Sequence, residues 1–84
     1  MIKIYTTSWC PSCVSAKNLL AELNIDFEEI NIEELEMSRE ELFDITGGMS
    51  VPQIVINQKS IGGYENLLHL MQSGQLDKLL GKWN

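Results

Sequence analysis

The stretch "YTTSWCPSCVSAKNLLAEL", Tyr5 to Leu23, passes from a strand-like pattern to a helix-like pattern and holds both cysteines of the chain at the junction. Residues 2–7 are β-rich and apolar at alternate positions, which predicts a first strand. After Pro11 the apolar residues follow the i, i+3, i+4, i+7 spacing of a helix: Ala16, Leu19, Leu20 and Leu23. Pro11 suits the first helical position, because its missing N–H has no intrahelical partner there. The stretch therefore predicts a strand followed by a helix that begins beside Cys10.

The remaining patterns predict the element order β-α-β-α-β-β-α. Ser38 and Glu41 form a capping-box pattern that opens a second helix, which contains the apolar residues Leu42, Phe43 and Ile45. The other expected elements are strands at 26–32, 51–57 and 59–61, a helix after Gly62-Gly63, and a further helical turn or two at 75–80. A strand–helix–strand unit pairs its strands in parallel and a hairpin adds antiparallel strands. We therefore expect a single α/β domain over residues 1–84, with one four-stranded mixed sheet flanked by helices.

The charge of the chain restricts its partners. The formal net charge is −6, and nine of the twelve acidic residues lie between Asp26 and Asp44. This acidity disfavours nucleic acid and anionic membranes as partners. The acidic cluster is interpreted as a solvated face, with a docking surface for basic proteins as the alternative. The start "MIKIYTT" lacks the features of a secretory signal, and no apolar run approaches the ~20 residues of a membrane span, so a cytoplasmic location is expected.

Two cysteines separated by two residues favour redox chemistry. A disulfide across so short a loop removes little chain entropy, so stapling explains the spacing poorly. Structural zinc uses four ligands, and the chain offers only Cys10, Cys13 and the distant His69, which is interpreted as a surface residue of its helix. A helix N-terminus stabilises an anion and lowers the pKa of a thiol. We therefore expect Cys10 to be the nucleophile and Cys13, one turn further in, to resolve the mixed disulfide.

Two further signals are weaker alone. The Val51–Pro52 bond is a candidate cis bond at a strand start, where it would turn the backbone of Val51 toward an extended thiol substrate, although an ordinary loop proline fits equally well. Gly62-Gly63 marks either a tight strand-to-helix turn or a close approach of the backbone to a carboxylate at the next helix N-terminus.

Taken together, these pieces resemble the glutaredoxin family, which has a thioredoxin-like fold. The matching segments are "YTTSWCPSC" (Tyr5–Cys13), "SVPQIVIN" (Ser50–Asn57) and "IGGYENL" (Ile61–Leu67), where the family has C-P-Y-C, T-V-P and G-G-x-D motifs. The resemblance covers essentially the whole chain. It implies a monomeric oxidoreductase that uses glutathione as a co-substrate, holds no tightly bound cofactor or metal, and acts on disulfide or glutathionylated proteins.

The resemblance also implies a glutathione groove. Val51, ahead of a cis Pro52, would pair its backbone with the cysteinyl part of glutathione. The γ-glutamyl end would meet backbone N–H groups and a side-chain acceptor from Gly63, Tyr64 and Glu65. By the same resemblance the active-site rim includes Pro11 and Ser12, and Arg39 can reach the glycine carboxylate.

Several positions depart from the family pattern. Ser12 replaces a Tyr of the active-site rim, Ser50 replaces Thr, and Glu65 stands where the family usually has Asp. Thr7 replaces a Lys that favours the thiolate and a glutathione carboxylate, which leaves Arg39, Lys17 and, less suitably, Lys3 as candidate cations. The segments "TTSWC" and "GGMSVP" are also similar to mycoredoxins, glutaredoxin relatives that use another small thiol.

Three functions are therefore weighed. The first is glutathione-dependent reduction of protein disulfides and glutathione mixed disulfides, in electron transfer and redox homeostasis, with reduction by thioredoxin reductase or another small thiol as the alternative. The second is a dimer that holds a glutathione-ligated [2Fe–2S] cluster through Cys10, which Pro11 disfavours by family precedent. The third is an inert domain in which the cysteine pair is vestigial.

Overall fold

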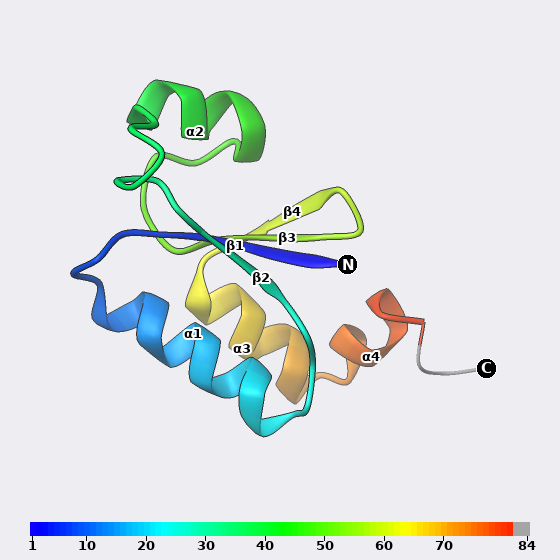
Figure 1. Cartoon of the computed structure of the whole chain (residues 1–84). Coiled ribbons are helices and arrows are strands. Elements are labelled where there is room, and N and C mark those ends of the chain that lie inside the picture. Colours follow the sequence, from blue (N-terminus) through cyan, green and yellow to red (C-terminus); the bar gives the residue numbers. More distant parts are fainter. Residues whose placement is uncertain (82–84) are drawn as a thin grey trace.

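The computed structural model describes residues 1–81, and residues 82–84 of the expected domain lie outside the described range. Residues 1–81 form eight elements in the predicted order, and the last predicted helical turns form a helix of their own (Figure 1). The elements are β1 (Ile2–Thr6), α1 (Pro11–Glu22), β2 (Glu28–Asn31), α2 (Arg39–Thr46), β3 (Gln53–Ile56), β4 (Lys59–Gly62), α3 (Tyr64–Gln72) and α4 (Gln75–Leu79).

The strands form one four-stranded mixed sheet, as predicted, and the structure gives their order as β2-β1-β3-β4. β1 pairs with β2 in parallel, from Lys3 opposite Glu28 to Thr6 opposite Asn31, because α1 provides the crossover between them. β3 is antiparallel to β1 and to β4, and the β3–β4 hairpin turns at Asn57 and Gln58. This topology places the carboxyl end of β1 beside the start of β3, with Tyr5 opposite Gln53. The segment that leads to Cys10 therefore lies near Val51, just before β3.

Helices cover both faces of the sheet. α1 and α3 lie together on one face and α2 lies on the other (Figure 1). The larger core lies between the sheet and the α1–α3 layer, where Ile4, Leu20, Ile54 and Leu67 are fully buried. A smaller core of Tyr5, Ile32 and Leu42 lies under α2. Burial of apolar surface on both faces fixes the register of the strands, since a one-residue shift would exchange the faces.

The strand boundaries are narrower than the sequence predicts. β3 begins at Gln53 and not at Val51, because Pro52 has no N–H to donate to the ladder. β2 is limited to Glu28–Asn31, which are the residues that pair with β1, whereas 26–32 was expected. β1 ends at Thr6, which leaves Thr7 in the loop that leads to Cys10.

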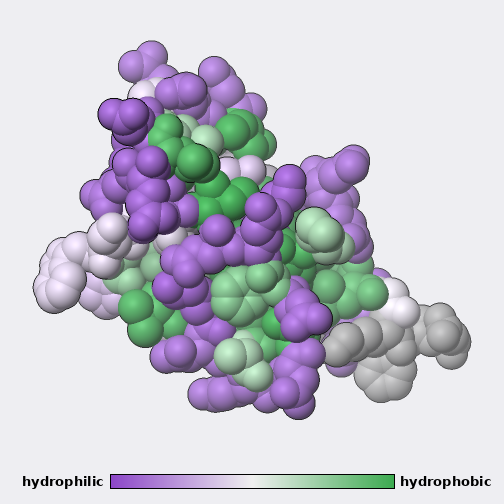
Figure 2. Space-filling model, in the orientation of Figure 1, coloured by the Kyte–Doolittle hydropathy of each residue, from purple (hydrophilic) through white to green (hydrophobic). Residues whose placement is uncertain are grey.

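The second helix has the predicted capping box, in which Ser38 and Glu41 bond each other's backbone N–H groups. Of its three apolar residues only Leu42 is buried, together with Thr46 one turn later. Phe43 and Ile45 are about half exposed, at 51% and 50%, because they lie off the Leu42–Thr46 face. Figure 2 shows apolar atoms over α2 within a largely hydrophilic surface. None of the helices within residues 1–81 has the length and apolarity that a membrane span requires.

Candidate active site

Cys10 and Cys13 lie where the chain passes from β1 into α1. Cys10 is the N-cap residue of α1, and Pro11 occupies the first helical position. The two sulfur atoms are joined in a disulfide, with the Cα atoms 5.2 Å apart. Cys10 is partly exposed, whereas Cys13 is buried, with only 1% of its surface accessible to solvent. The structure therefore gives the two thiols the unequal exposure that nucleophilic and resolving roles require.

The start of α1 favours negative charge on the sulfur of Cys10. The backbone N–H of Cys13 donates a hydrogen bond to Cys10 Sγ at 3.1 Å. No acidic residue occupies the first turn of α1, so nothing there offsets the positive end of the helix dipole. In the reduced protein the same N–H group and dipole would stabilise a thiolate at Cys10.

Side chains from the β2–α2 segment hold the loop that precedes Cys10. Glu33 Oε1 accepts a hydrogen bond from the Ser8 N–H at 2.8 Å, and Asn31 Nδ2 donates to Ser8 Oγ at 3.2 Å. The backbone bond from Ser8 lowers the pKa of Glu33 below its ordinary value, and the Ser8 hydroxyl adds to this. The loop is therefore held by its neighbours while Trp9, 91% exposed beside Cys10, faces solvent.

A groove of about 270 Å³ lies next to the cysteine pair. The Val51–Pro52 bond is cis, as the sequence allowed, and the carbonyl oxygen of Val51 lies 3.7 Å from Cys10 Sγ. A Cβ added at Gly63 would lie 3.5 Å from the Pro52 carbonyl oxygen, so the G-G segment and the proline segment face each other. Residues predicted from the sequence that line this groove are Ser12, Val51, Pro52, Gly63, Tyr64 and Glu65.

Two groove residues had no predicted role. Ser50 was singled out only as a replacement for Thr, and its carbonyl and hydroxyl oxygens accept from Gln53 Nε2 at 3.0 and 3.4 Å. Asn66 is part of the "GGYEN" segment, and its place in the first turn of α3 could have indicated it. Pro11 and Arg39 are not among the residues that line the groove.

The candidate cations lie in different surroundings. Lys17 Nζ is 2.9 Å from Glu29 Oε2, and this hydrogen bond lowers the pKa of Glu29, with a further contribution from the Thr6 hydroxyl. Lys17 is therefore engaged by a carboxylate. Arg39 Nη1 donates to the carbonyl oxygen of Met49 at 2.9 Å, which places a guanidinium beside the segment that leads into the groove. Thr7 supplies no charge at its position.

The described part of the chain contains no group of three or more His, Cys, Asp or Glu side chains that could hold a metal ion. His69 is exposed on α3, as expected.

Comparison with known proteins agrees with this geometry. Residues 2–61 match the family model described as Glutaredoxin. A glutaredoxin of Pseudomonas aeruginosa is 43% identical over 79 residues, which cover 94% of each chain. The solution structure of a glutaredoxin from Brucella melitensis superimposes with a TM-score of 0.77 at 39% identity, over 94% of this chain and 86% of that one. A buckwheat glutaredoxin crystallised in complex with glutathione superimposes with a TM-score of 0.84 at 23% identity, over 96% of this chain and 76% of that one.

Proposed function

The chain belongs to the glutaredoxin family, and we propose that it is a glutathione-dependent reductase of glutathionylated proteins and protein disulfides. Family and fold support the coarser statement, a thiol-disulfide oxidoreductase of the dithiol type. The observation that carries the finer proposal is the groove beside Cys10, whose far wall is the start of α3.

The start of α3 supports a carboxylate-bearing ligand in that groove. Gly63 is the N-cap residue of α3, and no side chain caps the helix there. Backbone N–H groups of the first turn are thus left for a ligand, and the helix dipole favours an anion. Glu65 lines the same groove and offers an acceptor for an ammonium group. These features fit the γ-glutamyl end of glutathione. The buckwheat glutaredoxin, which has the same fold, was crystallised in complex with glutathione, and this supports glutathione as the ligand.

We assign the reduction of a glutathionylated protein to Cys10 alone. The Cys10 thiolate attacks the glutathione sulfur, a Cys10–glutathione disulfide forms, and the protein leaves as a thiolate that takes a proton. The thiolate of a second glutathione then attacks the glutathione sulfur of that disulfide. Oxidised glutathione leaves and the Cys10 thiolate is restored. Each cycle thus consumes one free glutathione, and the glutathionyl group taken from the substrate leaves as the other half of the oxidised glutathione.

Reduction of a protein disulfide requires both cysteines. The Cys10 thiolate attacks one substrate sulfur and releases the other as a thiolate. The Cys13 thiolate then attacks Cys10 Sγ and frees the second substrate sulfur, which leaves the Cys10–Cys13 disulfide that the structure contains. Two glutathione molecules reduce this disulfide and are oxidised to one disulfide. We propose the cytoplasm as the setting, because its reduced glutathione would drive this step.

The identity of the electron donor is tested by two coupled assays. The oxidised full-length protein is mixed with glutathione, glutathione reductase and NADPH, and in parallel with thioredoxin reductase and NADPH, and NADPH consumption is followed. We expect the glutathione couple to be faster. Faster reduction by thioredoxin reductase would overturn the glutathione proposal and favour the alternative donor. The neutral Thr7 and the engaged Lys17 make this test necessary, because neither supplies a cation for glutathione.

A further inference from the structure

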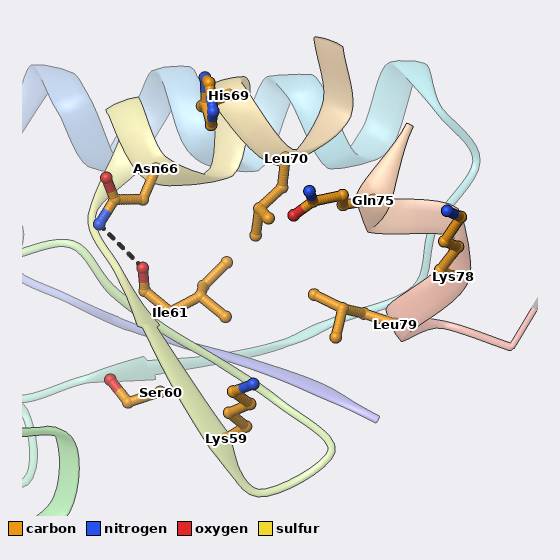
Figure 3. A pocket seen from close by; sticks show the side chains of 9 residues that line it. All are labelled: Lys59, Ser60, Ile61, Asn66, His69, Leu70, Gln75, Lys78 and Leu79. Carbon is orange, nitrogen blue, oxygen red and sulfur yellow. Dashed lines mark hydrogen bonds between the residues drawn. The ribbon is translucent and has the colours of Figure 1, made fainter. Parts of the chain in front are cut away.

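A second cavity, of about 510 Å³, lies between β4, α3 and α4 (Figure 3). It is distinct from the groove beside Cys10: the two share Asn66, and all their other lining residues differ. Asn66 Nδ2 donates to the carbonyl oxygen of Ile61 at 2.9 Å, and this bond forms part of the wall. A volume of ~300–1,000 Å³ is typical of sites for small molecules.

The inside of this cavity is apolar. Figure 3 shows Ile61 from β4, Leu70 from α3 and Leu79 from α4 pointing into a common space. All three are partly buried and pack against the larger core, so the cavity is an open extension of that core. It stays open because the chain turns at Gly74, in the left-handed conformation with φ of 81°, and α4 is anchored through the buried Leu76. The gap between Leu79 and Ile61 is therefore built into the fold.

The rim of the cavity is basic. Lys59, Lys78 and His69 line it from three elements, and no acidic residue lines it. This is unusual for the chain, which has twelve acidic residues against six Lys and Arg. Neither lysine takes part in an ion pair within residues 1–81, where the structure shows the pair Lys17–Glu29. The rim therefore favours an anion, which the apolar inside would hold by its hydrocarbon part.

We propose that this cavity binds a small amphipathic carboxylate, with its apolar body against Ile61, Leu70 and Leu79 and its carboxylate at the rim that Lys59 and Lys78 line. The charges decide between occupants. An amine would be repelled by the rim, and a neutral alcohol would leave the lysines unused. A polyanion such as nucleic acid would have to approach a chain of net charge −6, whereas a single carboxylate meets only the basic rim. The proposal does not depend on the chemistry of Cys10.

The site is tested by NMR on the full-length protein with its disulfide intact and with ¹³C-labelled Ile and Leu methyl groups. Octanoate and decanoate are titrated below their aggregation concentrations, with octanol and octylammonium as neutral and cationic controls. We expect saturable shifts and ligand contacts at the methyl groups of Ile61, Leu70 and Leu79. Each added methylene should tighten binding by up to about fourfold. Octanol should bind more weakly than octanoate, and octylammonium should not bind.

Variants test the basic rim. Lys78→Gln and Lys59→Gln should each weaken decanoate binding by about two- to fivefold, whereas Lys3→Gln, which removes a lysine outside the cavity, should not. The proposal is overturned if octanol binds as tightly as octanoate with the lysine variants unaffected, or if the contacts lie in the groove beside Cys10. It is also overturned if no saturable shift is seen, or if the methyl shifts change with protein concentration alone, since a second copy would then fill the cavity.

Discussion

The two cysteines differ in exposure although one helical turn separates them. Cys10 caps α1 and is partly exposed, whereas Cys13 is 1% exposed. We expect Cys10→Ser to lose turnover of both a glutathionylated peptide and a protein disulfide, because no other sulfur can form the first mixed disulfide. Cys13→Ser should keep most deglutathionylation, which needs only Cys10 and a second glutathione, and lose protein-disulfide reduction, in which Cys13 resolves the mixed disulfide. Coupled NADPH assays with each substrate measure the two rates.

A matched control for these variants is Ser15→Ala, which removes a small polar side chain from the exposed face of α1, outside the groove. It should leave both activities unchanged. Equal loss of both activities in Cys13→Ser would contradict the assigned division between the two sulfurs.

The carboxylate of Glu33 gives the active-site loop an acid dependence. Its pKa is lowered chiefly by the Ser8 N–H bond, so the bond is fully present above the ordinary value of 4.5 and is lost as pH falls through the lower folded value. We expect the Ser8 amide resonance to titrate with a midpoint below 4.5 in an NMR pH series. Glu33→Gln should abolish this transition, and Glu34→Gln should retain it. A Ser8 amide that does not respond to acid would show that the bond is absent in solution.

At the level of elements, the turn from β4 into α3 depends on glycine. Gly62 has φ of 97°, and an added Cβ would collide with the Asn66 side chain, which bonds the Ile61 carbonyl oxygen. Gly47, which ends α2 with φ of 81°, has nothing within 4 Å of an added Cβ. Gly47→Ala should therefore cost about 1 kcal/mol of unfolding free energy, from backbone strain alone, and Gly62→Ala clearly more.

Thermal unfolding followed by circular dichroism compares these two variants. At about 4–8 °C per kcal/mol for a domain of this size, the two melting temperatures should be resolved from each other and from the wild type. Equal losses would mean that the Asn66 side chain moves aside without cost.

Local pattern predicted the elements well and their packing less well. Some features depend only on residues close together in the sequence, so the sequence predicts them. They are the alternation within strands, the capping box at Ser38, and the helix boundaries at Gly47 and Gly74. The exposure of Phe43 and Ile45 depends on how far α2 extends beyond the sheet, which only the tertiary structure defines. For the same reason β2 is shorter than its apolar pattern, since its length is set by pairing with β1.

For the whole molecule, the residues of the candidate site were predictable where they belong to a sequence motif. The groove brings together segments around Ser12, Val51 and Gly63, which the three motifs had indicated. The ties of Glu33 and Asn31 to Ser8 were not predicted, because the residues are distant in sequence and no motif joins them. The ion pair between Lys17 and Glu29 was also not predicted, since it forms between residues of α1 and β2 that are distant in sequence. Contacts between elements that no motif joins thus remained beyond what the sequence alone could indicate.

The charge distribution of the whole chain leads to a last prediction. Nine acidic residues lie between Asp26 and Asp44 in a chain of net charge −6, so repulsion among them should destabilise the folded state at low ionic strength. The screening length falls from ~30 Å at 0.01 M salt to ~10 Å at 0.1 M, so added salt should weaken the repulsion. We expect the melting temperature to rise by a few degrees, about 0.5–1 kcal/mol of stability, between 0.01 M and 0.5 M sodium chloride. Glu34→Lys should raise the low-salt melting temperature and reduce its salt dependence, whereas Ser15→Ala should change neither. A melting temperature that falls with salt would instead mean that attractive pairs such as Lys17–Glu29 outweigh the acidic cluster.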